Sequence, residues 1–524
     1  MSRAPELRPA AILVAWFIAL GAIFLQIERG TGDRMLVLLF TAFDLLLVAA
    51  LACSLLVVAQ RWRLAILAAP ALVLLVYLAS WQKMRFSAMA AQAHDIADLV
   101  SGWALVAPFA WAVVVPAAAG IALLAALAFV EKPLGQRLPA RLLLAVLAVA
   151  LFAACVRIDD WLPADDHRLL AAGSGPKVAL FFRSIYEPPT LEPATVAELK
   201  DACCTGANAD DALAFRGTVK PNLVIVLQES TFSPTILRGY GRTGGFLLDG
   251  AAPLRVHVLG GGTWVEEFSI LHGIPATAYG DDYLQINWLG PAHHLEGRLA
   301  PLLEREGYRT SSVYPTDGRV LGAKELHRSL GIREFRACSD IAGCVTGRNW
   351  TETADSALFD EVLDILADES RPHFVFTATM RQHSPHVSQY PLSRFKSEIM
   401  EEYGRRLALS DGEAQAFVEA LQRLRRPTFV LMFGDHIPSD VLAAFDPGEF
   451  VADPYLTFFN FYDADGSAQA EAVMRRYPQV AAPDTAFVDA LLLDFAGFEG
   501  PYIDAKLAFM RRCGGFFCTA GPDE

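Results

Sequence analysis

Five long apolar segments in the first 160 residues constrain this chain more than any other feature. Each is close to the roughly 17–25 residues that a helix needs to cross a bilayer. They cover residues 10–27, 35–59, 64–81, 103–130 and 142–158. A cleaved signal peptide would account only for the first, and no Ala-x-Ala site followed by a polar start is present. We therefore expect a five-helix membrane domain over 1–160, a linker over 161–215 and a globular domain over 216–524.

The distribution of Lys and Arg predicts how the membrane domain is oriented. If the five segments alternate across the membrane, one side carries more positive side chains than the other: Arg3, Arg8, Arg61, Arg63, Lys132, Arg137 and Arg141 against Arg29, Arg34, Lys83 and Arg85. The more positive side is cytoplasmic. The N-terminus is then inside the cell, and an odd number of spans puts the globular domain outside.

The cysteines agree with an exported globular domain, because disulfides persist outside the cytoplasm. Cys338 lies close to Cys344 in the sequence, and Cys513 lies close to Cys518, so we expect these two bonds. The pairing of the adjacent cysteines at 203 and 204 is left open. Two further cysteines fall inside apolar segments and are expected to act as small apolar fillers: Cys53 and Cys155.

From residue 220 onward, short apolar runs alternate with helical patterns. The runs are "NLVIVLQES", "TSSVYP", "HFVFTATM" and "TFVLMFGDH", and "ADSALFDEVLDILADE" is typical of a helix. This alternation predicts an α/β domain with a mostly parallel central sheet. Ligands bind such sheets beyond the carboxyl ends of the strands. The polar residues at those ends are Glu229, Asp317, His383, Asp435 and His436.

Glu229, Asp435 and His436 form a plausible ligand set for a metal ion. An acid at the end of a buried strand is expensive unless it is paired or bound to a metal. Carboxylate and neutral imidazole groups are both metal donors. Alternatively, Asp435 caps a helix and Glu229 is a surface carboxylate at a loop entrance. The net charge of −14, together with the absence of a basic patch, P-loop or GxGxxG motif, argues against a nucleic-acid partner.

Thr263 follows three glycines in "VLGGGTWVEEF" and has two interpretations. With Glu266 it makes a T-x-x-E pattern, which predicts a capping box at the start of a helix. The N-terminus of a helix also favours an anion, and bare glycines let a ligand approach the backbone. A capping residue and a nucleophile are therefore compatible at this position.

These motifs, in this order, resemble those of the membrane-anchored phosphoglycerol and phosphoethanolamine transferases of the alkaline phosphatase and sulfatase superfamily, such as lipoteichoic acid synthase. The resemblance covers nearly the whole chain. It implies that Thr263 in "GGTWVEEF" is the nucleophile and completes a metal site with Glu229 of "VLQES" and with Asp435 and His436 of "GDH". It also implies a substrate-side role for His383 in "QHSPH".

Departures from the family's motifs bear on the substrate. No Cys/Ser-x-Pro-x-Arg motif is present, so sulfate-ester hydrolysis is not expected. "DHIPSD" replaces the Asp-His-Gly-Glu-Ser pattern of phosphoethanolamine transferases and is nearer the phosphoglycerol branch. The Trp-Asn-Arg stretch of that branch is missing from "DGRVLGAKELHR". Asp317, Arg319 and Lys324 are therefore the candidates for contacts with the donor head group.

The resemblance implies a reaction and a location. A divalent metal, Zn²⁺ or Mn²⁺, activates Thr263, and the threonine takes a phosphoglycerol-type head group from a phospholipid. The head group then passes to a hydroxyl of a glycan, lipid or other envelope acceptor, while His383 binds or protonates phosphoryl oxygens. The catalytic domain would lie on the periplasmic side of a bacterial inner membrane. The alternatives are a phosphoethanolamine transferase, a membrane-anchored phosphodiesterase and a non-catalytic binding protein.

Overall fold

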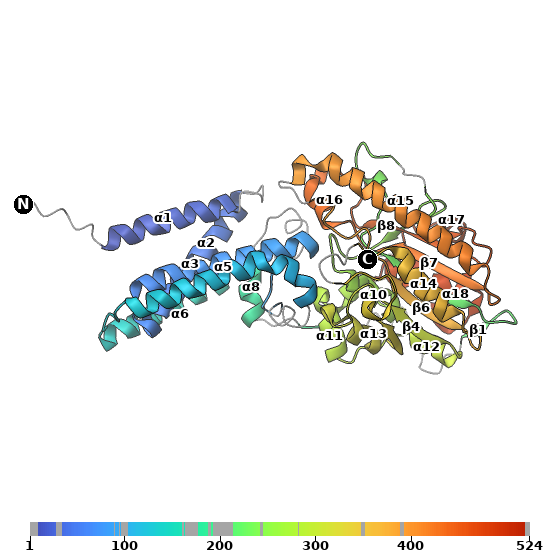
Figure 1. Ribbon diagram of the computed structural model, residues 1–524, viewed down its shortest axis with the longest axis horizontal. Coiled ribbons are helices and arrows are strands. Elements are labelled where there is room, and N and C mark those ends of the chain that lie inside the picture. Colours follow the sequence, from blue (N-terminus) through green and yellow to red (C-terminus); the bar gives the residue numbers. More distant parts are fainter. Residues whose placement is uncertain are drawn as a thin grey trace, which may run out of the picture. The chain divides into compact units, whose positions relative to one another are not determined.

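The computed structural model divides into two compact units, shown in Figure 1: residues 1–97 with 106–188, and residues 98–105 with 189–524. We call them the helical unit and the α/β unit. The structure describes residues 9–27, 34–87, 90–93, 95, 103–159, 162, 177–186, 190–191, 213–241, 245–280, 282–346, 352–387 and 392–518. Cys203, Cys204 and most of the expected linker lie outside these residues.

The helical unit contains helices over all five apolar segments. They are α1 (Pro9–Ile27), α2 (Arg34–Ala59), α3 (Trp62–Ser87), α5 (Trp103–Val130) and α6 (Leu138–Asp159). Within the described residues, three helical stretches are long and apolar enough to cross a membrane: Met35–Ala59, Trp62–Trp81 and Leu138–Asp159. The searched parts of α1 and α5 are shorter, Ala15–Gln26 and Val115–Val130. Three candidate spans are thus supported by length and composition, and the count of five stays a prediction.

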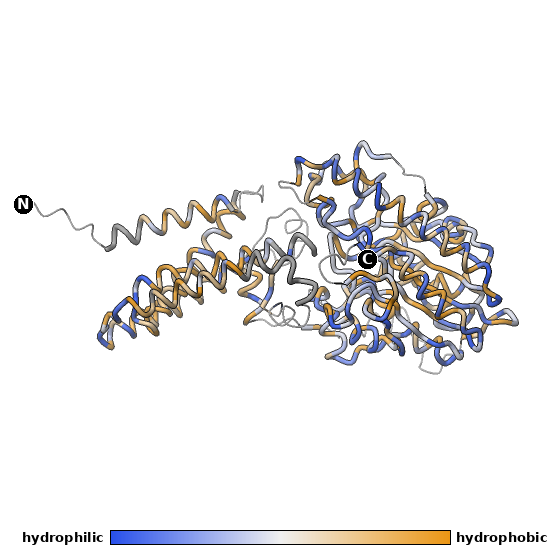
Figure 2. Tube along the Cα trace, in the orientation of Figure 1, coloured by the Kyte–Doolittle hydropathy of each residue, from blue (hydrophilic) through white to orange (hydrophobic). Residues whose placement is uncertain are grey.

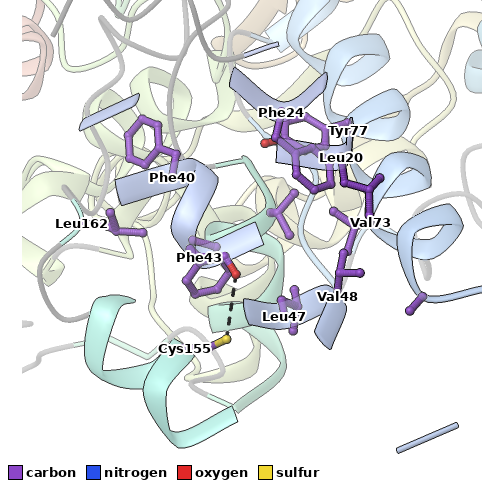
Figure 3. Packing of buried hydrophobic residues seen from close by; sticks show 13 residues of the cluster. Leu20, Phe24, Phe40, Phe43, Leu47, Val48, Val73, Tyr77, Cys155 and Leu162 are labelled. Atoms are coloured by element: carbon purple, nitrogen blue, oxygen red, sulfur yellow. Dashed lines mark hydrogen bonds between the residues drawn. The ribbon is translucent and has the colours of Figure 1, made fainter. Parts of the chain in front are cut away.

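Apolar side chains hold the helical unit together. Figure 2 shows its helices as predominantly hydrophobic. The ring of Phe24 in α1 stacks on that of Tyr77 in α3, with centroids 5.9 Å apart. Figure 3 shows Phe43 of α2 facing Cys155 of α6, whose thiol is 4.0 Å from the Phe43 carbonyl oxygen. Cys155 is buried and unbonded to another cysteine, as expected of an apolar filler.

A short helix, α8 (Lys177–Tyr186), lies within the region expected to be a linker. Val178 and Ala179 on α8 are buried in the core of the helical unit. Arg183 donates from Nε to Asp159 Oδ2 at 2.7 Å and so ties α8 to the end of α6. Residues 177–186 of the expected linker therefore pack against helices that precede them.

The α/β unit is built on a seven-stranded sheet in the order β3-β8-β7-β2-β6-β4-β5. Its strands are β2 (Asn222–Gln228), β3 (Ala252–Arg255), β4 (Arg309–Val313), β5 (Glu334–Arg336), β6 (His373–Ala378), β7 (Thr428–Gly434) and β8 (Leu456–Tyr462). The strands β7, β2, β6, β4 and β5 run parallel to one another, while β8 is antiparallel to β7 and β3. The prediction of a mostly parallel sheet is confirmed.

Helices flank the sheet in Figure 1, and the central strands are buried along their whole length. The described helices are α10 (Thr263–His272), α11 (Ile286–Ala292), α12 (Leu299–Arg305), α13 (Ala323–Ser329), α14 (Asp355–Leu366), α15 (Lys396–Leu421), α16 (Ser439–Ala444), α17 (Ala470–Met474), α18 (Val488–Phe495) and α19 (Pro501–Arg512). A separate pair, β1 (Ala214–Phe215) and β9 (Phe498–Glu499), is antiparallel. Continuous apolar strands are typical of parallel sheets covered on both faces.

Both expected disulfides are present in the α/β unit. Cys338 is bonded to Cys344, and Cys513 is bonded to Cys518. Each closes a short loop, as the spacing in the sequence predicts.

Candidate active site

Two adjacent parallel strands bring three candidate metal ligands together. Gln228 at the end of β2 pairs with Gly434 at the end of β7, so Glu229 and Asp435 leave the sheet side by side. Glu229, Asp435 and His436 are all buried, and one ligand atom from each lies within 4.8 Å of the others. Neither alternative reading holds, since Glu229 is not at the surface and Asp435 does not cap a helix.

The backbone around this group is tightly constrained. A side chain at Gly434 would place its Cβ 1.8 Å from the carbonyl oxygen of Thr231, so only glycine fits where the β2 loop crosses β7. Asp435 Oδ1 accepts hydrogen bonds from the backbone N–H groups of Ser230 at 2.7 Å and His436 at 2.9 Å. These bonds orient the carboxylate and leave its second oxygen facing the other ligands.

The unpaired donor atoms of this group suit a divalent cation. Within the described residues, Asp435 Oδ2 has no hydrogen-bond partner although it is buried, and it lies 3.2 Å from His436 Nε2. His436 Nδ1 is 3.1 Å from the Ile437 carbonyl oxygen. A carbonyl only accepts, so the ring proton sits on Nδ1 and Nε2 presents its lone pair. Oxygen and imidazole donors of this kind fit Zn²⁺ or Mn²⁺.

Electrostatics point to the same conclusion. Burial and then the nearby charge of Glu229 raise the pKa of Asp435 well above its ordinary value. Burial lowers the pKa of His436, which favours the neutral ring that binds metals. Two buried carboxylates repel each other, and a bound cation would remove that repulsion.

Thr263 faces the ligand group, but it does not cap α10. The N-cap is Gly262, and no side chain bonds the first turn there. Gly260, Gly261 and Gly262 have φ values of 72°, 147° and 96°, in the region that favours glycine. The Thr263 hydroxyl instead donates to Glu229 Oε2 at 2.7 Å and lies 3.4 Å from His436 Nε2.

The capping-box prediction is therefore wrong, and Glu266 shows why. Its carboxylate accepts from the backbone N–H of His257 at 2.5 Å, and its second oxygen lies 3.2 Å from His257 Nδ1. Glu266 thus bonds the strand-to-helix connection rather than the N-cap residue. The hydroxyl of Thr263 remains directed at Glu229 and His436.

His383 lies in the loop that follows β6, the strand beside β2. Its Nδ1 atom is 2.6 Å from the Ser384 carbonyl oxygen, which again places a ring proton on Nδ1. The charge of His383 is one of the weaker contributions that lower the pKa of His436, after burial. His383 is half-buried at the same edge of the sheet as the ligand group.

The three candidate head-group residues follow β4 and do not join the buried ligand group. Asp317 and Arg319 pair with each other, Oδ2 to Nη2 at 2.9 Å, and the Arg319 side chain is 76% exposed. Hydrogen bonds from Arg319 lower the pKa of Asp317. Lys324 is half-buried in the first turn of α13. Their contact with a head group stays a prediction.

Two buried clusters beside the site were not foreseen. Glu267 of α10 accepts from Tyr314 at 2.9 Å, and its other oxygen lies 3.2 Å from His327 Nε2. Asp440, four residues after His436, bonds the loop that carries His383. The motif "GGTWVEEF" contains Glu267, but no role for that residue followed from the sequence. The one sequence signal for the Asp440 cluster was the additional acid, Asp440, in "DHIPSD".

Comparison with known proteins shows what the residues around this site are similar to. The family model described as Sulfatase matches residues 221–453, which include Glu229, Thr263, His383, Asp435 and His436. A "putative cyclic beta-1,2-glucan modification protein" of Rhizobium meliloti is 20% identical over 239 residues, 42% of this chain and 36% of that protein. The chain spans 57% and 36% of the lengths of two curated relatives that it matches.

Solved structures show a similar fold. The "lipooligosaccharide phosphoethanolamine transferase A" of Neisseria meningitidis is 13% identical, with a TM-score of 0.50 over 89% of this chain and 96% of that one. The Streptococcus pyogenes phosphoglycerol transferase GacH, in complex with sn-glycerol-1-phosphate, is 17% identical, with a TM-score of 0.48 over 64% and 91%. The α/β unit therefore resembles the Sulfatase family model over residues 221–453, and the fold is similar to that of the Neisseria meningitidis protein.

Proposed function

We propose that this chain transfers a phosphoglycerol-type head group from a phospholipid to an acceptor hydroxyl. The observation that carries the proposal is the Thr263 hydroxyl, which donates to Glu229 at 2.7 Å within the group of buried metal-ligand side chains. A threonine at such a place is an activated nucleophile rather than a structural residue. The superfamily match over residues 221–453 supports a reaction at phosphorus.

The reaction proceeds as two displacements. Thr263 Oγ1 attacks the phosphorus of the donor, its proton passes toward Glu229 Oε2, and the bond from phosphorus to the diacylglycerol oxygen breaks. Diacylglycerol leaves with the proton that Thr263 gave up, and Thr263 carries the phospho head group. The oxygen of an acceptor hydroxyl then attacks the same phosphorus, its proton passes to Glu229, and the bond from phosphorus to Thr263 Oγ1 breaks. Thr263 regains its hydroxyl proton from Glu229. Glu229, Asp435 and His436 would hold a divalent ion, which would neutralise charge and lower the pKa of the threonine hydroxyl.

Other residues would orient the substrate. His383, at the same edge of the sheet, is placed to bind the phosphoryl oxygens or to protonate the departing oxygen. Asp317, Arg319 and Lys324 are the candidates for the head group itself. Residues 1–160 would form the multi-pass membrane domain, and 216–524 the catalytic domain on the periplasmic face of the inner membrane. A tethered domain meets a phospholipid donor at the outer leaflet, where that donor is concentrated.

A phosphoethanolamine head group is the second candidate. It is favoured by the fold match with the Neisseria meningitidis phosphoethanolamine transferase, which extends over 89% of this chain. The phosphoglycerol candidate is favoured by "DHIPSD", which lacks the Gly-Glu-Ser that follows Asp-His in phosphoethanolamine transferases. A glycan acceptor is consistent with the relative described as a glucan modification protein.

Mass spectrometry of Thr263 tests both candidates at once. The full chain is incubated with vesicles whose lipids are labelled separately in glycerol and in ethanolamine, and the peptide that contains Thr263 is analysed without acceptor. We expect a glycerol-labelled phosphate adduct on Thr263 and none in Thr263→Ala. An ethanolamine-labelled adduct would select the second candidate. Lipid turnover with no adduct on Thr263 would overturn the covalent route.

A further inference from the structure

We propose that Asp440 is a positioning residue that holds His383 against the reacting phosphoryl group. The proposal rests on the proposed function, since it assumes that His383 acts on phosphoryl oxygens. Among the described residues, the hydrogen-bond partners of the Asp440 carboxylate are Ser384, His386 and Val441, none of which belongs to the ligand group. Asp440 acts through the loop between Arg381 and His386.

Asp440 bonds that loop with both carboxylate oxygens. Oδ1 accepts from the Ser384 hydroxyl at 2.9 Å, and Oδ2 accepts from the His386 backbone N–H at 2.5 Å. The His386 ring donates from Nδ1 to Oδ1 at 3.0 Å. Ser384 and His386 lie on either side of Pro385, immediately after His383. The carboxylate therefore fixes the backbone next to His383 on its C-terminal side.

Arg406 of α15 holds the same loop from another side. Its guanidinium donates from Nη1 to the His383 carbonyl oxygen at 3.0 Å and from Nη2 to the Pro385 carbonyl oxygen at 3.1 Å. Arg406 is itself oriented by Glu402, one helical turn earlier, through a 2.8 Å bond to Nε. The backbone that carries His383 thus has fixed partners on two elements.

The position of Asp440 in the chain explains why it suits this role. It follows His436 by four residues and lies in the first turn of α16. The short segment from His436 to Asp440 therefore has a candidate metal ligand at its first residue and a residue that bonds the His383 loop at its last. This connection sets the separation between the candidate metal and the imidazole, which catalysis requires to be maintained closely.

A purely structural residue at this place would not need a charge. Asp440 is 3% exposed. Burial alone would raise its pKa, but the charge and hydrogen bonds of His386 and Ser384 outweigh burial and lower the pKa to about 2. Apolar residues of similar volume often stabilise a fold as well as a buried ion pair does. Apart from the Val441 backbone N–H in its own helix, the partners of the Asp440 carboxylate are Ser384 and His386 of the His383 loop, so orientation of that loop is the benefit that accounts for the charge.

A double-mutant cycle on the full chain separates positioning from general stability. Asp440→Asn keeps the size of the side chain but loses the charge and one acceptor, and we expect kcat for lipid turnover to fall on the order of 100-fold. Because Asp440 acts through His383, the same substitution should change the residual rate of His383→Ala by less than twofold. The exposed Asp504→Asn is the matched control, and it should leave kcat unchanged in both backgrounds.

Two further measurements test the same proposal without depending on the Asp440→Asn activity. Hydrogen exchange of the peptide that spans residues 379–387 should speed up in Asp440→Asn and stay unchanged in Asp504→Asn, while peptides of β2 and β7 remain protected. Ser384→Ala removes one bond to Asp440 without removing its charge, so it should show a smaller kcat loss that also disappears in the His383→Ala background. This milder variant replaces Asp440→Asn if that protein does not fold.

Each outcome decides the question. The positioning role would be overturned if Asp440→Asn lowered kcat by the same factor in the wild type and in His383→Ala. Unchanged hydrogen exchange in residues 379–387 of Asp440→Asn would overturn it as well. If the wild-type chain turned over neither lipid donor, the proposed transferase function would fail. The exchange measurement would then still decide whether Asp440 orders the loop.

Discussion

The prediction that follows most directly from the buried ligand group concerns Asp435→Asn in the metal-free protein. Asn has the shape of Asp, and its oxygen can keep the hydrogen bonds from the backbone N–H groups of Ser230 and His436. Its amide nitrogen then takes the place of Asp435 Oδ2, which has no hydrogen-bond partner within the described residues. We expect the substitution to stabilise the metal-free protein while it abolishes metal binding.

The magnitude follows from the geometry. Two unit charges 4.8 Å apart, the outer limit for the ligand atoms of Glu229 and Asp435, repel by about 3.5 kcal/mol at an effective dielectric constant of about 20. The raised pKa of Asp435 relieves some of this repulsion, so we expect a gain of about 1–3 kcal/mol at neutral pH. For a domain of this size, that gain corresponds to a rise of several degrees in Tm, at roughly 2–4 °C per kcal/mol.

The pH dependence has a definite sign. The pKa of Asp435 is raised in the fold, so the protonated form is the favoured one. The stability associated with that proton is fully present below the unfolded-state pKa of about 3.9 and is lost as the pH rises toward the folded-state pKa. Asn does not titrate. The advantage of Asp435→Asn should therefore vanish near pH 4 and grow as the pH approaches neutrality.

The assay is thermal unfolding of the full chain in detergent, with a chelator or with Zn²⁺ or Mn²⁺, from pH 4 to pH 8. The wild type should gain stability from metal, and Asp435→Asn should not. Asp504→Asn, an exposed substitution of the same chemistry, should match the wild type throughout. If chelated Asp435→Asn were no more stable than the wild type at neutral pH, the electrostatic reasoning would be refuted. Full metal stabilisation of the variant would refute the ligand assignment.

Three further predictions address the nucleophile, the frame of the site and the membrane topology. Thr263→Ala should abolish turnover yet lower stability by only about 1–2 kcal/mol, the loss of one hydrogen bond to Glu229, while Thr263→Ser should keep partial activity and give a phosphoserine detectable by mass spectrometry. Tyr403→Phe should lower stability by about 2 kcal/mol or more in thermal unfolding, because the buried Tyr403 hydroxyl both donates to the Phe232 carbonyl oxygen and accepts from the Phe232 N–H. A reporter enzyme fused after residue 165 should be active only in the exported compartment, and cytoplasmic activity would contradict the orientation.

The sheet could be predicted because its central strands are short apolar runs with helical patterns between them. β2 and β6 are buried along their whole length, and the centre of each is an apolar run, "LVIVL" in β2 and "FVF" in β6. The reversed direction of β8 could not be predicted in the same way. It is almost wholly buried between β7 and β3, and a buried strand has the same apolar pattern whichever way it runs.

From the positions of the strand ends we could predict which side chains lie at the carboxyl edge of the sheet. The directions in which these side chains point could not be predicted. Glu229 and Asp435 meet because the register of β2 and β7 places them side by side. Asp317 follows β4 in the same manner, yet it turns to Arg319, two residues away and exposed. A short-range partner in the same loop requires no long-range ordering, so it competes well with a buried site that is farther off.

At the start of α10, the two interpretations of Thr263 differ by one residue in the position of the N-cap. A threonine at the N-cap position uses its hydroxyl to accept a hydrogen bond from the first turn of its own helix. Three successive glycines with positive φ instead make Gly262 the N-cap, and Thr263 becomes the first helical residue. Its hydroxyl is then not needed by the backbone and can donate to Glu229. The glycines therefore have a purpose beyond close approach of a ligand, because they release the threonine oxygen from capping and present it to the ligand group.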